Sequence, residues 1–113
     1  MTRSWWYKAR QTRERIQSWW RPMSTQMIEG DAPDALRPRT LYIITDDREP
    51  WQACMRCPLG CDHTIQLNLI EGIRPRWTSR VDEGLTTLAP SVWRTDACRC
   101  HVFVRNGRIV WCD

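Results

Sequence analysis

Short apolar runs begin after Arg39 and continue to the end of the chain. Some alternate with polar residues and others are rich in β-branched and aromatic residues, and both kinds are typical of β-strands. The clearest run covers residues 64–70, where Ile65, Leu67 and Leu69 fall on one face and polar residues fall on the other. Four further strands are predicted at residues 41–45, 51–55, 77–81 and 85–88.

The last two strands are predicted at residues 100–105 and 108–112, with Asn106-Gly107 between them. Asn-Gly between two alternating runs is typical of a β-hairpin, because both turn residues need a positive φ. The sequence therefore predicts a mainly β fold: a small antiparallel sheet domain with a C-terminal β-hairpin and a separate N-terminal helix.

The first 38 residues follow a different pattern. Residues 4–21 repeat apolar positions near a 3.6-residue period, from a candidate N-cap at Ser4 to a helix-ending Pro22. Residues 22–38 contain proline and glycine without periodicity and are predicted to be a linker. The predicted organisation is a basic Trp-rich helix over residues 1–21, a linker over 22–38 and a β domain over 39–113.

The formal net charge of +4 belongs to the predicted helix. Residues 1–22 carry their Lys and Arg side chains against Glu14 alone, while the rest of the chain is close to neutral. A basic Trp-rich helix can bind nucleic acid, with Arg10, Arg13 and Arg15 as candidate contacts. The neutral charge of the remaining chain weakens this interpretation for the protein as a whole.

No stretch of the sequence is long and apolar enough to cross a membrane. The longest uncharged run is residues 84–93, whereas a spanning helix needs about 20 apolar residues. The N-terminal residues also lack the apolar core of a secretory signal. We therefore expect a cytoplasmic protein with reduced thiols, and its six cysteines favour metal ligation over disulfides.

Two clusters of Cys and His carry the candidate chemistry. Cys57 and Cys61 flank a Pro-Leu-Gly turn that can point both sulfurs inward, and two residues separate Cys98 from His101. Two such pairs can supply the four tetrahedral ligands of Zn²⁺. The sequence predicts one zinc ion in the β domain, held by Cys57, Cys61, Cys98 and His101.

Neighbouring residues leave the ligand set open. Cys54 or Cys100 could replace a chosen ligand, although Cys100 and His101 should point to opposite faces of one strand. His63 is expected to be solvated or packed, and Cys112 to pack within the last strand. Four protein ligands leave no open position for water, and no H-E-x-x-H motif is present, so an enzyme is favoured less than a binding protein.

Several blocks of residues after position 36 occur in the order of a known family. These blocks are Arg37-Pro38, Pro50-Trp51, Cys57-Pro58-Leu59-Gly60-Cys61, Ile65-x-Leu67-Asn68-Leu69, Arg74-Pro75-x-Trp77, Pro90-Ser91-Val92-Trp93-Arg94 and Cys98-x-x-His101-Val102-Phe103. In this order the chain resembles an uncharacterised bacterial family, a domain of unknown function, which has a further Cys at the position of Leu59. Its genes lie beside those of ubiquitin-like systems: an activating enzyme, a conjugating enzyme, a JAB-type metalloprotease and a ubiquitin-like protein. The resemblance implies ubiquitin-like modification or antiphage defence, and no particular reaction.

Three functions follow from these observations. We favour a zinc-stabilised accessory module that binds a protein partner, such as a ubiquitin-like modifier or its conjugating or activating enzyme. Its candidate contacts are Trp residues beside Arg, a combination that is common at interfaces and in Arg–Trp stacks: Arg74, Trp77, Trp93 and Arg94. Nucleic-acid binding by the N-terminal helix is the alternative, and a zinc-dependent enzyme is the second alternative.

Overall fold

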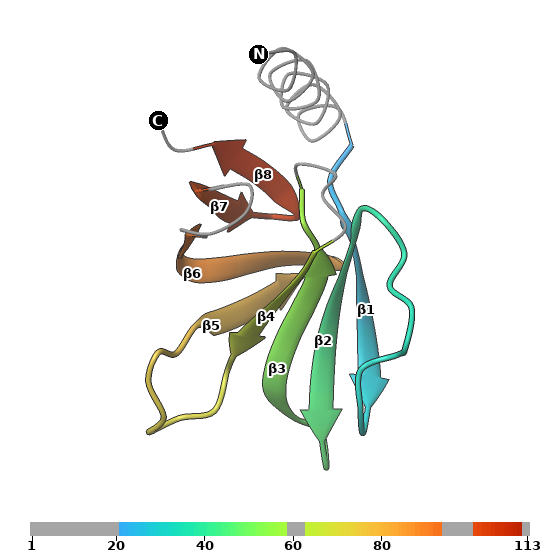
Figure 1. Ribbon diagram of the computed structural model, residues 1–113, viewed down its shortest axis with the longest axis vertical. Coiled ribbons are helices and arrows are strands. Elements are labelled where there is room, and N and C mark those ends of the chain that lie inside the picture. Colours follow the sequence, from blue (N-terminus) through green and yellow to red (C-terminus); the bar gives the residue numbers. More distant parts are fainter. Residues whose placement is uncertain (1–20, 59–62, 94–100, 112–113) are drawn as a thin grey trace.

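The computed structural model describes residues 21–58, 63–93 and 101–111, and these residues form two four-stranded sheets (Figure 1). Sheet A contains β1 (Ser24–Glu29), β2 (Thr40–Asp46), β3 (Glu49–Arg56) and β4 (Thr64–Asn68), in that order. Sheet B contains β5 (Thr78–Asp82), β6 (Leu85–Trp93), β7 (His101–Arg105) and β8 (Arg108–Trp111). The mainly β fold is confirmed, and the pairing is antiparallel throughout except for β1, which runs parallel to β2.

Residues 22–38 differ from the prediction of a linker, because they contain β1. This strand pairs with β2 along its whole length, from Ser24 opposite Thr40 to Glu29 opposite Thr45. Its side chains do not alternate between buried and exposed positions, so no periodicity marked the strand in the sequence. The predicted helix over residues 4–21 lies outside the described residues apart from Arg21.

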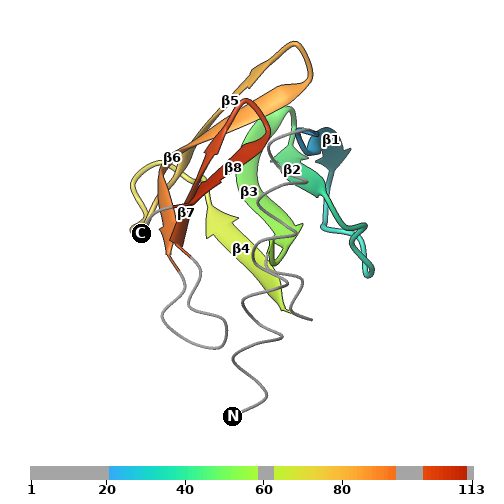
Figure 2. The same ribbon diagram turned by 90° about the horizontal axis from the view of Figure 1, so that it is seen from above.

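The main core lies between the two sheets, which form two layers (Figure 2). Alternate side chains of β2 and β3 reach it from sheet A, among them Leu41, Ile43 and Met55, while Val102 and Val104 reach it from sheet B. The face predicted for residues 64–70 is confirmed, since Ile65, Leu67 and Leu69 are all buried there.

The other face of sheet A holds a second buried cluster. Tyr42, Ile44 and Cys54 are buried on this face, and Ala32 and Leu36 pack over them. The segment that carries Ala32 and Leu36 runs beside β1 and β2 in Figure 1. Because β2 is covered on both faces, it forms one continuous apolar run in the sequence.

The predicted Asn106-Gly107 hairpin is confirmed, with φ angles of 50° and 78°. Backbone hydrogen bonds at this turn also connect β6 of sheet B to Met23, just before β1. Gly107 N–H donates to the Thr86 carbonyl oxygen at 2.7 Å, and Met23 N–H donates to the Gly107 carbonyl oxygen at 2.8 Å. A Cβ at position 107 would lie only 2.7 Å from the Met23 carbonyl oxygen, so this close approach requires glycine.

Within the described part of the chain, no helix has the length and apolar character needed to cross a membrane.

Candidate functional site

The outer face of sheet B carries a serine and a histidine that contact each other. Along β6 and β7, Val92 and Val102 point into the core, so Ser91, Trp93 and His101 lie on the opposite face. Ser91 Oγ and His101 Nε2 are 2.9 Å apart, which is a hydrogen bond between the two side chains. Both residues are half-buried.

The strand register explains why these two residues meet. Trp93 is directly opposite His101 across the β6–β7 pair, and Ser91 is two residues before Trp93 on the same face. Ser91 and His101 are therefore diagonal neighbours, which long side chains can bridge. The pairing also shifts between Leu88 and Val92, and a bulge of this kind redirects the side chains beside it.

Two tryptophans contact this pair. The Trp77 indole Nε1–H donates to the Ser91 carbonyl oxygen at 3.2 Å. The Trp93 ring stacks on the His101 ring, with the ring centres 5.1 Å apart and the planes 19° from parallel. Trp93 is 66% exposed, so one side of its ring faces solvent at the site.

A serine hydroxyl bonded to an imidazole nitrogen is the arrangement that activates serine as a nucleophile. The imidazole accepts the hydroxyl proton as the oxygen attacks an electrophilic carbon. The separation between Ser91 and His101 is already within the range that such proton transfer needs. The geometry of this pair matches that of a serine nucleophile and its general base in acyl transfer.

The predicted zinc ligands are only partly within the described residues. Cys57 is buried just after β3, and His101 begins β7, but Cys61 and Cys98 lie outside the described ranges, as does Cys100. In the described part of the chain, no group of three or more His, Cys, Asp or Glu side chains is placed to hold a metal ion. The zinc site therefore stays a prediction.

The structure separates Cys54 from Cys57. Cys54 lies in the cluster with Tyr42 and Ile44, whereas Cys57 lies in the core between the sheets, on the other face of sheet A. Burial raises the pKa of the Cys54 thiol, which favours the neutral form over the thiolate that binds metals. The two sulfurs are therefore not placed to share one metal ion. His63 is exposed.

The residues predicted to bind a partner lie in different environments. Arg74 is exposed, Trp77 packs partly buried against the core, and Trp93 covers His101. Arg94 and the candidate nucleic-acid contacts Arg10, Arg13 and Arg15 lie outside the described residues.

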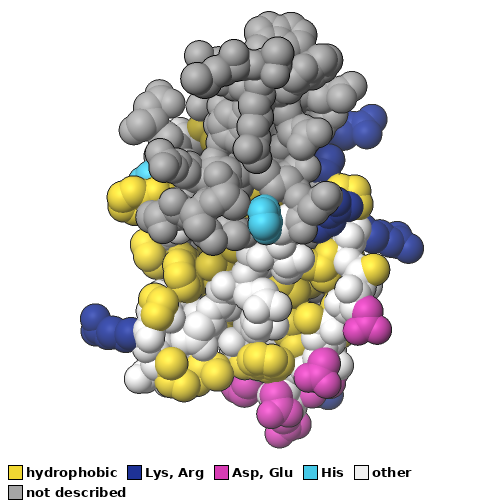
Figure 3. Space-filling view, in the orientation of Figure 1, with side chains coloured by type: hydrophobic (Ala, Val, Ile, Leu, Met, Phe, Trp, Pro, Cys, Tyr) yellow, Lys and Arg dark blue, Asp and Glu magenta, His cyan; other side chains and the backbone are white. Residues whose placement is uncertain are grey.

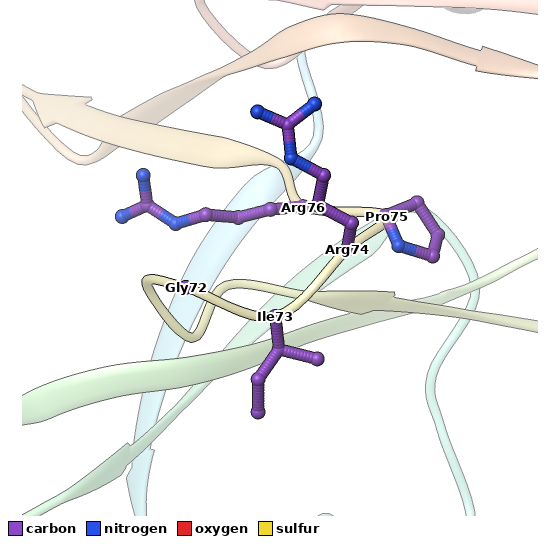
Figure 4. Close-up of a pocket in the computed structure, with 5 residues that line it drawn as sticks. All are labelled: Gly72, Ile73, Arg74, Pro75 and Arg76. Carbon is purple, nitrogen blue, oxygen red and sulfur yellow. The ribbon is translucent and has the colours of Figure 1, made fainter.

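Arg74 belongs to a loop between β4 and β5 that surrounds a cavity of about 750 Å³, lined by Gly72, Ile73, Arg74, Pro75 and Arg76 (Figure 4). The Ile73 side chain points away from the two arginine side chains in Figure 4. Asn68 holds the loop, because its Nδ2 donates to the Ile73 and Pro75 carbonyl oxygens at 2.9 and 3.1 Å. The loop thus presents Arg74 on an ordered backbone.

Acidic side chains gather at the end of the molecule where Figure 1 places the β2–β3 turn (Figure 3). Glu29 belongs to this group and accepts hydrogen bonds from Thr45 Oγ1 at 2.6 Å and from the Asp47 amide. These bonds stabilise the β2–β3 turn, whose residues Asp47 and Arg48 have φ angles of 52° and 69°.

A family model described as "Bacterial ubiquitination-like system serine protease (BubE)" matches residues 28–112. The chain belongs to the BubE family. The predicted membership of a family linked to bacterial ubiquitin-like systems is thereby confirmed, and the match begins within β1. No curated protein and no solved structure matches the chain.

The sequence did not single out Ser91, which the structure places beside His101. Ser91 and His101 are ten positions apart and belong to different strands, and no motif joins them. The only available signal was that both residues stand in blocks that carried the family resemblance.

Proposed function

We propose that this BubE-family chain is a serine peptidase that cleaves a protein of the bacterial ubiquitination-like system. Ser91 is the nucleophile and His101 is the general base. The observation that carries the proposal is the 2.9 Å hydrogen bond between Ser91 Oγ and His101 Nε2. The serine protease named in the family description supports it independently.

The reaction follows from the two side chains. In the tautomer with its hydrogen on Nδ1, His101 accepts the Ser91 hydroxyl proton at Nε2 while Ser91 Oγ forms a bond to the substrate carbonyl carbon. The C–N bond of the substrate then breaks, and the imidazolium gives that proton to the leaving amine. Water, deprotonated by His101, cleaves the resulting ester and restores Ser91.

The substrate class follows from the family and from the position of the dyad. The dyad lies on an outer sheet face beside the exposed Trp93, where a segment of a folded protein can reach it. We propose the ubiquitin-like modifier as this protein, cleaved at its C-terminal end or at its link to another chain. The protein partner expected from the sequence is then the substrate.

Labelling with a fluorophosphonate–biotin probe tests the nucleophile, because such probes form a covalent bond to activated serines. We expect labelling at Ser91, located by mass spectrometry. Ser91→Ala should abolish it, and His101→Asn should lower the labelling rate by at least about 10³-fold. Ser79→Ala, which changes a half-buried serine on β5, is the matched control and should label normally.

Cleavage of a modifier fused to a C-terminal reporter tests the substrate. The modifier is the ubiquitin-like protein of a bacterial ubiquitination-like system, the kind of system named in the family description. Release of the reporter that depends on Ser91 supports the proposal. Labelling of Ser91 without release of the reporter would support a peptidase and contradict the modifier as its substrate. Labelling that persists in the Ser91→Ala variant would contradict the dyad itself.

We also propose that Arg74 contacts the protein substrate. It is exposed on the loop that Asn68 holds in place, and this loop leads into Trp77, which contacts Ser91. Arg74→Ala should raise KM for the modifier fusion about threefold to tenfold and leave kcat unchanged. Arg80→Ala, an exposed arginine on β5, is the control, and equal KM values for the two variants would contradict the contact.

The zinc ion is a further proposal, and it competes with the dyad for His101. Because Nε2 faces Ser91, a metal ion bound to this imidazole has to take Nδ1, which leaves the hydrogen on Nε2. His101 could then donate to Ser91 but could not accept its proton. The two roles of His101 therefore exclude each other in one molecule.

Elemental analysis of protein purified without added metal decides between these roles. If zinc is bound by Cys57, Cys61 and Cys98, we expect one equivalent per chain. Cys57→Ser should lose the metal and up to about 10 kcal/mol of folding free energy, while Cys112→Ser should lose much less. Less than half an equivalent in folded protein contradicts the zinc site, and loss of zinc in His101→Asn contradicts the dyad.

A further inference from the structure

The two halves of the dyad are each contacted by a tryptophan, and the two tryptophans lie in different environments. Trp77 packs against the core between the sheets and donates its indole hydrogen to the Ser91 carbonyl oxygen. Trp93 lies on the outer face and stacks on the His101 ring. One tryptophan therefore restrains the backbone of the serine, and the other restrains the ring of the histidine.

We propose that Trp77 and Trp93 are positioning residues of the dyad, an inference that rests on the proposed function. They set the relative placement of Ser91 Oγ and His101 Nε2, and hence the rate of serine attack. Neither tryptophan donates or accepts the transferred proton, so each affects the rate only by positioning Ser91 or His101.

Trp93 takes the place of an orienting group for His101. In Ser–His–Asp triads, a carboxylate holds the imidazole in position and stabilises the imidazolium that forms. Across the described ranges, no Asp or Glu side chain contacts His101. The stacked indole restricts rotation of the imidazole, and its π face attracts the positive charge that His101 gains from the Ser91 proton.

Trp77 restrains Ser91 where the strand pairing is irregular. The β6–β7 register shifts between Leu88 and Val92, so the regular ladder is interrupted around the nucleophile. The bond from the Trp77 indole reaches the Ser91 carbonyl in this interval. The Trp77 backbone is itself anchored, because its N–H donates to the Asn68 carbonyl oxygen at 2.8 Å.

Variants at both positions separate a positioning role from a merely structural one. Trp77→Phe keeps an aromatic ring in the core but removes the indole N–H together with the five-membered ring that carries it. Trp93→Phe keeps a ring for stacking, whereas Trp93→Leu keeps an apolar side chain and removes the π face. Trp51→Phe is the control, since Trp51 packs against the second cluster on the far face of sheet A.

The measurement is the second-order rate of fluorophosphonate labelling at Ser91 in the full chain, with circular dichroism to confirm the fold. We expect Trp77→Phe and Trp93→Leu each to slow labelling at least tenfold. Trp93→Phe should stay within about threefold of the parent, and Trp51→Phe should match it. With the modifier fusion, Trp77→Phe should lower kcat at nearly constant KM.

The outcomes distinguish this inference from the proposed function. Parent protein that does not label at Ser91 overturns both. If the parent protein is labelled at Ser91 and the Trp77→Phe and Trp93→Leu variants are labelled at the same rate, the positioning role is overturned. The proposed peptidase is not affected by that result. A Trp93→Phe variant as slow as Trp93→Leu contradicts stacking as the cause, because the aromatic ring would then provide no rescue.

Discussion

Sheet A and sheet B each have four strands and share one core, but they differ in what covers their outer faces. The outer face of sheet A is packed beneath Ala32 and Leu36, and Ile44 is fully buried there. The outer face of sheet B carries Trp93 and Val110, which are 66% and 38% exposed.

This difference places the tightly packed side chains and the candidate site on different sheets. Both faces of sheet A are covered, so the side chains on each face pack tightly against their neighbours. Loss of even a few atoms from such side chains lowers the free energy of unfolding. The outer face of sheet B carries a half-buried hydroxyl and imidazole, while its inner face packs in the core and keeps the strands that carry them in register. Sheet A thus mainly stabilises the fold, and sheet B carries the candidate site.

Removal of β1 should have the largest effect on this division, because β1 belongs to sheet A and contacts sheet B. Met23 is buried in the shared core, and Thr25 Oγ1 is 2.5 Å from Thr86 Oγ1 on β6. A chain that starts at Ala35 loses these contacts and uncovers β2, so its free energy of unfolding should fall by more than about 4 kcal/mol. Urea denaturation measures the loss.

The matched comparison is a chain that starts at Arg21, which keeps β1 and should be more stable than the chain that starts at Ala35. Equal stability of the chain that starts at Ala35 would mean that β1 contributes little, and residues 22–38 would then act as the linker predicted from the sequence.

A pair of substitutions compares the inner and outer faces directly. Ile43 in β2 is 0% exposed, and Ile43→Ala should lower the free energy of unfolding by about 2–5 kcal/mol through lost burial and a residual cavity. Val110→Ala on the outer face of sheet B should cost no more than about 1 kcal/mol. If urea denaturation gives equal losses, the outer face of sheet B is packed as tightly as sheet A, and the contrast fails.

The smallest expected effect on stability concerns Glu29, which is bonded to Thr45 and to the β2–β3 turn of sheet A. Hydrogen bonds from Thr45, and then from the Asp47 and Arg48 amides, lower the pKa of this carboxyl below its usual 4.5. A pKa lowered by folding contributes stability that is present above the unfolded pKa and is lost as pH falls through the folded pKa. Glu29→Gln should therefore be less stable than the parent at pH 7.

Thermal unfolding of the parent and Glu29→Gln at several pH values checks this prediction. The difference between them should shrink once the pH falls below about 4.5 and the parent carboxylate becomes protonated. A difference that is constant with pH would mean that the carboxylate charge does not stabilise the β2–β3 turn.

Where a strand has one buried face, alternation along the chain predicted it, because alternation depends on local geometry. A strand with one buried face repeats every two residues whatever its partner is, so Ile65, Leu67 and Leu69 could be assigned before the partner strands were known. The Asn106-Gly107 turn was equally local, since its two positive φ angles suit these residue types. β1 had no such pattern and was missed.

By itself, the sequence determined the mainly β fold, most of its strands, the final hairpin and the family of the chain, because each depends on residues close together or on blocks in a fixed order. Only the tertiary structure decided which residues meet. The parallel pairing of β1 with β2 and the face of sheet A that buries Cys54 both depend on how distant segments pack. The contact between Ser91 and His101 depends on the β6–β7 register and its shift before Val92, and a change of one residue in that register would place the two side chains on opposite faces.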